Sequence, residues 1–190
     1  MRVGVLALQG DVREHAEILE GLGADVVLVR LPEDLTDIDA LVLPGGESTT
    51  IGKLADRYGM VEPLRAAIRR GLPAFGTCAG MIFLSGSTTE ADPQVQLGVL
   101  DVVVQRNAFG RQAESFEADL AVEGIAEPVH AVFIRAPWVE KVGQGVDVLA
   151  EVDGHPVMVR EGNVLASSFH PELTGDDRIH ALLLAMVEEA

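Results

Sequence analysis

The chain of 190 residues is 48% hydrophobic, which suits one domain with a sizeable core, and we expect a single domain over residues 1–190. Its 30 acidic and 14 basic residues give a formal net charge of −16, which argues against non-specific binding to nucleic acid. There is no apolar stretch near the ~20 residues of a membrane span, no signal-peptide pattern at the start, and one cysteine, so we expect a cytoplasmic protein without membrane contacts or disulfides.

The N-terminal part of the chain alternates between two kinds of segment. Short apolar runs are typical of strands buried on both faces, and the segments between them have helical character. This alternation implies a parallel sheet with right-handed crossovers, in which functional residues gather at the carboxyl ends of the strands. The predicted fold class is therefore α/β, with an open, mostly parallel sheet between two layers of helices. The expected strands are Val3–Leu8, Asp25–Val29 and Ala40–Leu43, and the expected helices are Glu14–Leu22, Thr50–Tyr58 and Glu62–Arg70.

A glycine turn follows the third expected strand, where Gly45-Gly46 precedes Glu47 and Ser48 at the start of a helix. Glycine allows φ > 0, so this backbone can aim an N–H group outward. The N–H of Gly46, together with that of Ala79, could form an oxyanion hole. The alternative is an ordinary strand-to-helix loop with a serine cap.

Cys78, the only thiol of the chain, lies between another apolar run and a helix-like segment. Gly76 and Gly80 flank it in the Gly-x-nucleophile-x-Gly pattern of a nucleophile elbow. In such an elbow a strand turns sharply into a helix, glycines allow their close approach, and the helix dipole favours the thiolate. The alternative is a small buried hydrophobic residue without a catalytic role.

The middle of the chain is different, because strand-like segments separated by turns replace the alternation. We expect these strands to include an antiparallel part, which makes the sheet mixed. They are Val99–Gln105, Glu114–Leu120, Ala131–Ile134, Val146–Val152 and Pro156–Arg160, with Asp153-Gly154 as a turn and a closing amphipathic helix over Asp176–Glu188.

His170 follows Asn163–Phe169, which we interpret as a buried strand. Residues two apart in an extended segment point to the same side, and Pro171 biases His170 towards extended geometry. Glu172 is then placed beside His170 and can orient it, which completes a nucleophile–base–carboxylate triad with Cys78. The alternative is that His170 ends a strand and Glu172 begins the next helix.

Together these segments resemble class I glutamine amidotransferases and, within that class, the glutaminase subunits of pyridoxal 5′-phosphate synthases. The resemblance covers essentially the whole chain, with no departure at a position that would carry the chemistry, and it implies a flavodoxin-like fold. The cysteine and His-Pro-Glu motifs mark the broad class, and the other motifs separate this subunit from relatives in other pathways. The motifs are Val3–His15, Leu43–Thr50, Gly76–Gly80, Gln105–Phe116, Phe133–Pro137 and Ser168–Glu172.

The resemblance implies hydrolysis of L-glutamine to L-glutamate and ammonia through a cysteinyl thioester, with Cys78, His170 and Glu172 as the catalytic triad. For Arg106 and Arg135, which the resemblance places in the substrate site, two alternatives remain: an ordinary surface contact, or a position at the interface with a partner. No metal or other cofactor is expected, since the five histidines are scattered and one thiol cannot make a Cys-rich zinc site. The residues implied to hold glutamine are Gly46, Glu47, Ser48, Arg106, Ile134 and Arg135.

A partner is also implied, namely the synthase subunit that receives the ammonia through a tunnel and builds pyridoxal 5′-phosphate from a pentose phosphate and a triose phosphate, a route to vitamin B6. Because a lone glutaminase would waste glutamine, we expect low activity without the partner, with the Gly45-Gly46 peptide as the switch. Val12–His15 is either a helix start or part of the partner-facing surface. Another cysteine enzyme on the same architecture, or a binding protein with a residual site, remains an alternative.

Overall fold

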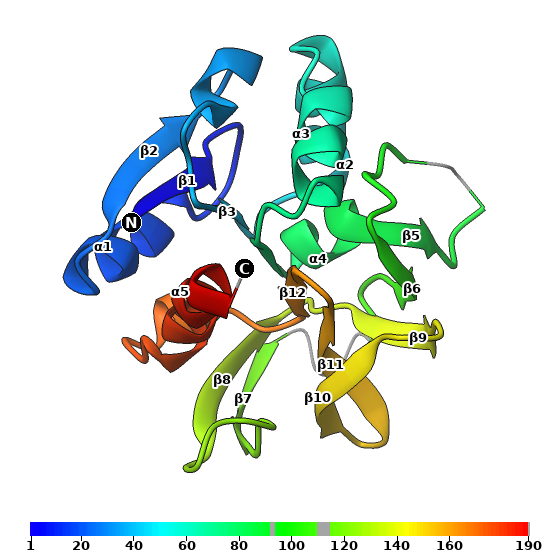
Figure 1. The fold of residues 1–190 in the computed structure, drawn as a ribbon. Helices are drawn as coiled ribbons and strands as arrows, with labels where there is room; N and C mark the ends of the chain where they lie inside the picture. The colour runs from blue at the N-terminus through cyan, green and yellow to red at the C-terminus, as the bar shows by residue number, and fades with distance from the viewer. Residues whose placement is uncertain (92–93, 110–114, 190) are drawn as a thin grey trace.

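The computed structural model describes residues 1–91, 94–109 and 115–189. Its main sheet is built from β1 (Arg2–Leu6), β2 (Asp25–Val29), β3 (Ala40–Leu43), β4 (Ala74–Thr77), β10 (Asp147–Val152), β11 (His155–Glu161) and β12 (Val164–Ser167). The strand order is β10-β11-β12-β4-β3-β1-β2 (Figure 1). The strands from β12 to β2 are parallel, whereas β10 and β11 are antiparallel to their neighbours. The predicted mixed, mostly parallel sheet is thereby confirmed.

Helices cover both faces of this sheet, because alternate residues of its buried strands enter two different cores. On β3, Leu41 and Leu43 belong to the core beneath α2, α3 and α4. Ala40 and Val42 belong to the core on the opposite face, which α1 and α5 cover. This confirms the three-layer arrangement. The helices are α1 (Val12–Gly21), α2 (Ser48–Arg57), α3 (Val61–Arg69), α4 (Ala79–Leu84) and α5 (Arg178–Glu189).

Two smaller sheets accompany the main one within the described residues: β5 (Ser85–Thr88), β6 (Leu100–Gln105) and β9 (Trp138–Val142) form one, and β7 (Ser115–Leu120) with β8 (Val129–Ile134) forms the other. The expected turn at Asp153-Gly154 is present, with φ of +52° and +79° between β10 and β11. The sequence pattern did not predict β5 and β9. Glu114, the expected start of β7, and positions 110–114 of the motif Gln105–Phe116 lie outside the described residues.

The ends of several elements differ from the predicted ones for local reasons. Strand β1 ends at Leu6 because its pairing with β2 ends at Leu6↔Val29, and the chain then turns at Gly10 with φ +104°. Helix α5 begins at Arg178, since the Asp176 carboxylate accepts a hydrogen bond from the Arg178 backbone N–H at 3.1 Å. The apolar pattern does not reveal the 3-10 helices η1 (Pro32–Leu35) and η2 (Pro171–Leu173).

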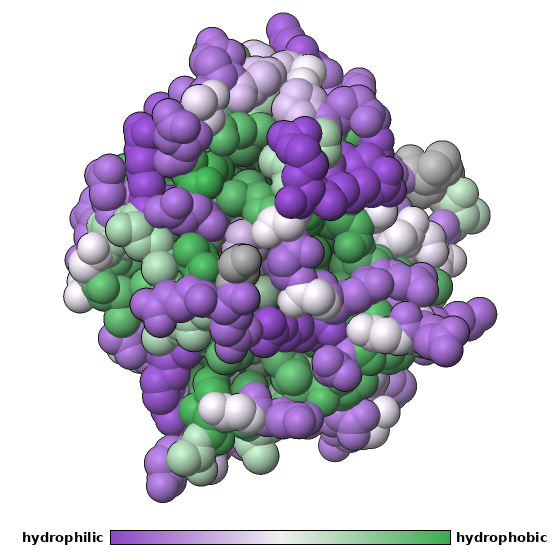
Figure 2. Space-filling view, viewed as in Figure 1, coloured by the Kyte–Doolittle hydropathy of each residue, from purple (hydrophilic) through white to green (hydrophobic). Residues whose placement is uncertain are grey.

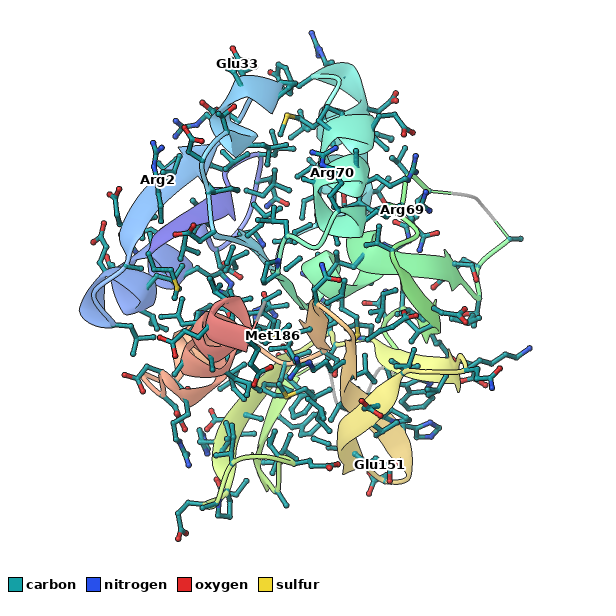
Figure 3. The ribbon with its side chains drawn as sticks, viewed as in Figure 1. Arg2, Glu33, Arg69, Arg70, Glu151 and Met186 are labelled. Atoms are coloured by element: carbon teal, nitrogen blue, oxygen red, sulfur yellow. The ribbon has the colours of Figure 1, made fainter. Side chains whose placement is uncertain are left out.

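Polar and apolar side chains separate as expected for a folded α/β chain. Hydrophilic side chains cover much of the face shown in Figure 2. Figure 3 places Arg2, Glu33 and Glu151 at the periphery, whereas Met186 of α5 lies near the centre and is buried. No helix in the described part of the chain is long and apolar enough to cross a membrane.

Candidate active site

Cys78 is the single residue between β4 and α4, and its φ of +47° and ψ of −101° are unusual for a residue with a side chain. The strand and the helix nearly touch here, because a Cβ on Gly76 would lie 2.6 Å from the Gly80 carbonyl carbon. A Cβ on Gly80 would overlap the Leu43 carbonyl group. The close approach of β4 and α4 thus accounts for Gly76, whereas Gly80 is required by the neighbouring strand β3 and not by β4. Strain at Cys78 is of the kind found at functional sites.

His170 directly follows β12 and a two-residue extension, and its ring lies between two carboxylates and the thiol. Its Nδ1 is 2.7 Å from Glu172 Oε1 and 3.4 Å from Asp11 Oδ2. Burial alone lowers the pKa of His170, but hydrogen bonds to Asp11, Cys78 and Glu172 raise it to about 12. The predicted contact with Glu172 is present, although it is made through the 3-10 turn η2 and not along an extended segment.

Glu172 lies behind His170 and away from solvent, with a side chain that is 0% exposed. Burial raises the pKa of Glu172, and the hydrogen bond with His170 acts against this rise. Its Oε1 contacts His170, whereas its Oε2 has no hydrogen-bond partner among the described residues. Cys78, His170 and Glu172 thus form a line from the pocket surface into the interior.

The turn at Gly45-Gly46 is held by the loop that follows β1. The Asp11 N–H donates to the Gly45 carbonyl oxygen at 3.2 Å, and the Glu47 N–H donates to Gln9 Oε1 at 2.7 Å. Glu47, and not Ser48 as the simple loop alternative supposed, caps α2 by accepting hydrogen bonds from backbone N–H groups. Partial burial by itself raises the pKa of Glu47. The hydrogen bonds from the backbone N–H groups and from the Thr50 hydroxyl outweigh it and lower this pKa to about 2.

All of these segments meet at one pocket with a volume of about 480 Å³. Every residue predicted to hold glutamine lines it, and so do Cys78, Ala79 and His170; Glu172 does not, because it lies behind His170. The structure thus places the two arginines at the pocket, with Arg106 Nη2 3.7 Å from Glu47 Oε1. The predicted lining residues are Gly46, Glu47, Ser48, Arg106, Ile134 and Arg135.

Further residues line the pocket that the sequence did not single out: Gln9, Asp11, Ile82, Asn107 and Leu173. Gln9 and Asp11 follow β1 at the carboxyl edge of the sheet, so their position after a parallel strand is a signal that could have found them. Leu173 follows Glu172 directly. Asn107 and Arg135 have φ of +46° and +43°, and no sequence pattern indicates this geometry for residues other than glycine.

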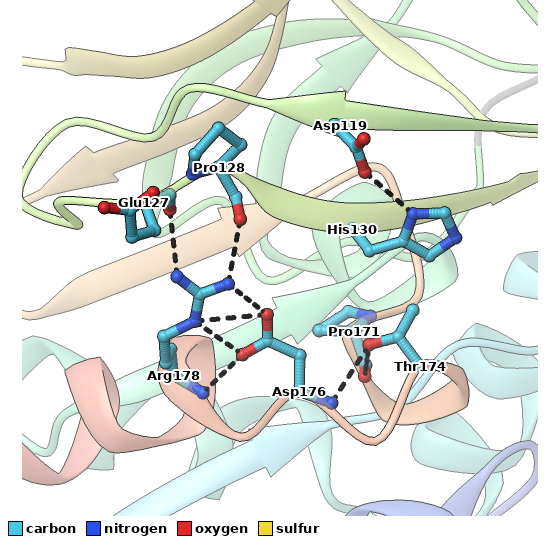
Figure 4. A network of polar contacts seen from close by, with 8 residues as sticks. All are labelled: Asp119, Glu127, Pro128, His130, Pro171, Thr174, Asp176 and Arg178. Atoms are coloured by element: carbon cyan, nitrogen blue, oxygen red, sulfur yellow. Dashed lines mark hydrogen bonds and ion pairs between the residues drawn. The ribbon is translucent and has the colours of Figure 1, made fainter.

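A clamp of polar contacts holds the segment that carries Glu172 (Figure 4). The Arg178 guanidinium donates to the carbonyl oxygens of Glu127 and Pro128, each at 2.9 Å, just before β8 begins. Arg178 Nε also donates to Asp176 Oδ1 at 2.9 Å, and the Thr174 hydroxyl donates to the Pro171 carbonyl oxygen at 3.0 Å. The turn after His170 is therefore tied to β8 and to the start of α5.

One group of side chains in the described residues is close enough to bind a metal, namely Asp11, His170 and Glu172. The ligand atom of His170 would be Nδ1, which already contacts both carboxylates. We therefore interpret the group as an imidazole hydrogen-bonded to its carboxylates and not as a metal site.

Val12–His15 is the start of α1, and His15 is fully buried, so His15 is not part of a partner-facing surface.

Comparison with known proteins gives a consistent family. The SNO glutamine amidotransferase family matches residues 5–189. A pyridoxal 5′-phosphate synthase subunit PdxT from Parafrankia sp. is 61% identical over 98% of this chain and 93% of its own length. One from Frankia alni is 58% identical over 100% of this chain and 96% of its own. A solved glutamine amidotransferase, 55% identical and covering 98% of both chains, superposes with a TM-score of 0.94.

Proposed function

The chain belongs to the SNO glutamine amidotransferase family, and we propose that it hydrolyses L-glutamine with Cys78 as nucleophile, His170 as acid and base, and Glu172 as the orienting carboxylate. It is a glutaminase subunit of a pyridoxal 5′-phosphate synthase, the assembly for which its relatives are named. The observation that carries the catalytic assignment is the line of contacts from Cys78 at the pocket through His170 to buried Glu172. Because the family match spans residues 5–189, one domain over residues 1–190 is part of the proposal.

The reaction proceeds through a covalent thioester. The Cys78 sulfur attacks the carboxamide carbon of glutamine, and the C=O π electrons move to the oxygen to give a tetrahedral oxyanion. His170, protonated at neutral pH because its pKa is raised, gives its proton to the departing nitrogen as the C–N bond breaks and ammonia leaves. The neutral imidazole then takes a proton from water, which attacks the thioester and releases glutamate and the thiolate.

Backbone N–H groups of Gly46 and Ala79 stabilise the oxyanion. Removing one donor from an oxyanion hole typically costs about 3 kcal/mol of transition-state stabilisation, so their placement decides whether the enzyme is active. Ala79 begins α4 next to Cys78, and Gly46 lines the same pocket. Their position on two elements that meet at Cys78 supports this role.

Glutamine binds with its carboxamide at Cys78 and its amino-acid end towards the charged rim of the pocket. Arg106 and Arg135 offer guanidinium groups suited to a carboxylate, and Glu47 is ionised at neutral pH because its pKa is lowered. Backbone groups at Gly46 and Ile134 and the buried Ser48 complete the proposed contacts. Here the pocket lining supports the assignment that the family resemblance implied.

The ammonia passes to the partner synthase subunit, which makes pyridoxal 5′-phosphate, a form of vitamin B6, and the cytoplasm is the expected location. The Gly45-Gly46 peptide is the proposed switch of this activity. Its C=O accepts a hydrogen bond from the Asp11 N–H, so a flip of the peptide requires that bond to break. The Gly46 N–H points opposite to the Gly45 C=O in a trans peptide, which makes one flip sufficient to change the oxyanion hole.

Alkylation of the only thiol tests the nucleophile assignment without ambiguity about the labelled site. Iodoacetamide should inactivate glutamine hydrolysis in step with modification of Cys78, and glutamine should slow both. Cys78→Ala should hydrolyse no glutamine while keeping the wild-type melting temperature. Hydrolysis that continues after complete alkylation would contradict the proposal.

A further inference from the structure

A second polar cluster lies behind Glu172, on the side away from the pocket, and the mechanism above does not use it. It consists of His15 on α1, Thr77 on β4 and His180 on α5, all 0% exposed. His15 Nδ1 is 2.8 Å from His180 Nε2, and His15 Nε2 is 3.2 Å from Thr77 Oγ1. The same His15 Nε2 is 3.6 Å from Glu172 Oε1. One imidazole therefore lies between the buried carboxylate and a second imidazole.

Both imidazoles of this cluster are neutral. Burial lowers the pKa of His15 well below its usual range, and the nearby His180 and His170 lower it further. Burial lowers the pKa of His180 to about 4. Each ring therefore carries a single proton, and the position of that proton decides what His15 can offer to Glu172.

The hydrogen-bond partners select one of the two arrangements of these protons. If His15 carried its proton on Nδ1, its Nε2 lone pair would face a carboxylate oxygen, and the His180 proton would sit on Nδ1, which has no partner in the described residues. A buried donor without an acceptor is costly. In the other arrangement the His180 Nε2–H donates to His15 Nδ1, and the His15 Nε2–H faces Thr77 Oγ1 and Glu172 Oε1.

We propose that His15 is a positioning residue for Glu172, held by His180 as the Nε2–H tautomer so that this N–H stabilises the ionised carboxylate that orients His170. This inference deepens the proposed function and rests on it. The carboxylate needs such support because it is fully buried and its Oε2 is unpartnered in the described part of the chain. Without it, protonation of Glu172 becomes easier, and a neutral carboxyl no longer stabilises the His170 cation.

Titratable groups approach Glu172 from several of the elements packed around it. His170 precedes it, His15 comes from α1, and Asp11 lies just before α1. Cys78 reaches the same imidazole from the β4–α4 turn, and His180 is one ring further from α5. Among these groups, His15 is the one whose substitution removes the N–H that faces the Glu172 carboxylate while leaving the pocket residues unchanged.

Three variants of the full chain, each assayed with its synthase partner, separate positioning from mere packing. His15→Phe keeps a ring but removes the N–H, and we expect the acid limb of the kcat/KM–pH profile to move up by about one unit, with about a tenfold loss of kcat/KM on that limb. His15→Gln restores an N–H near Nε2 and should return the limb towards the wild-type position. Leu19→Ala, a buried change one turn along α1, should lower the melting temperature without moving the limb.

The proposal would be overturned if the acid limb of the pH profile did not move in His15→Phe. It would also be overturned if the limb of His15→Gln stayed at the position found for His15→Phe. Glutaminase activity of the wild type would leave the proposed function intact in either case. A direct measurement needs no variant to fold. Long-range 1H–15N correlation spectra of the 15N-histidine-labelled chain should show His15 as the Nε2–H tautomer. A neutral His15 protonated at Nδ1, or a cationic one, would also refute it.

Discussion

Replacing Gly76 by alanine tests whether close contact between β4 and α4 places the nucleophile. The new Cβ would lie 2.6 Å from the Gly80 carbonyl carbon and 2.7 Å from its oxygen. Ordinary van der Waals contact begins near 3.4 Å, so the start of α4 must move by roughly 0.8 Å. These two backbone atoms cannot rotate away, whereas the third close neighbour, Leu84 Cδ1 at 2.6 Å, is the end of a side chain and can.

Overpacking of this kind costs up to about 3 kcal/mol, and the loss of glycine's freedom in the unfolded chain returns up to ~1 kcal/mol. The net loss of about 2 kcal/mol corresponds to a fall in melting temperature of roughly 4–8 °C for a chain of this size. Because a misplacement of ~1 Å can cost about 100-fold in rate, the movement of Cys78 and Ala79 should lower kcat/KM by about tenfold or more.

The assay is glutamate release by the chain with its synthase partner, divided by the folded fraction from a thermal melt. Gly4→Ala is the matched control, since Gly4 is also a strand glycine of the main sheet and its Cβ would meet methyl groups of Ile38 and Val29 at 2.9 Å. Those side chains can yield, so the control should keep its activity per folded molecule. Equal activity of the two variants per folded molecule would show that the contact between β4 and α4 does not place Cys78.

Three further predictions concern the carboxylates and the clamp. Glu172→Gln should lower kcat by roughly 100-fold or more at unchanged fold, because the amide cannot stabilise the His170 cation; a near wild-type kcat would contradict this. Glu47→Gln should destabilise the chain by about 1 kcal/mol by weakening the α2 cap. Since the pKa of Glu47 is depressed on folding, this difference should be full above the ordinary glutamate pKa and vanish as pH falls towards 2 in urea melts. Arg178→Ala should lower the melting temperature because its hydrogen bonds to the Glu127 and Pro128 carbonyl oxygens are lost. An unchanged melting temperature would show that these bonds do not stabilise the fold.

Much of the fold follows from local sequence signals. Strands Asp25–Val29 and Ala40–Leu43 have the predicted bounds. Ala40–Leu43 is buried throughout because its alternate residues enter both cores. Asp25–Val29 is instead the edge strand of the sheet with only Val29 buried, so its prediction as a strand buried on both faces was wrong. Strands β5 and β9 escaped prediction, since their pairing with β6 depends on contacts distant in sequence. The 3-10 turn at Pro171–Leu173 has no apolar period either, and it follows His170, whose backbone N–H donates to the Val132 carbonyl oxygen of β8, a contact distant in sequence.

The residues of the candidate site also divide into those with a local sequence signal and those without one. Cys78 with its two glycines carries a local signature, and the structure shows that a side chain at either glycine would meet backbone atoms at close range. The positions of Arg106 and Arg135 at the pocket came from the family resemblance, because arginine after a strand has no local signal of ligand contact. His15 could not be placed from sequence, since its burial depends on α1, β4 and α5 meeting behind Glu172.

The most direct test of the account is release of ammonia and glutamate from glutamine, measured for the wild type and for Cys78→Ala, each alone and with the cognate synthase subunit. We predict slow release by the wild type alone, strong stimulation by the partner, and none by Cys78→Ala in either case. Equal turnover by wild type and Cys78→Ala would contradict the central claim that this thiol attacks glutamine.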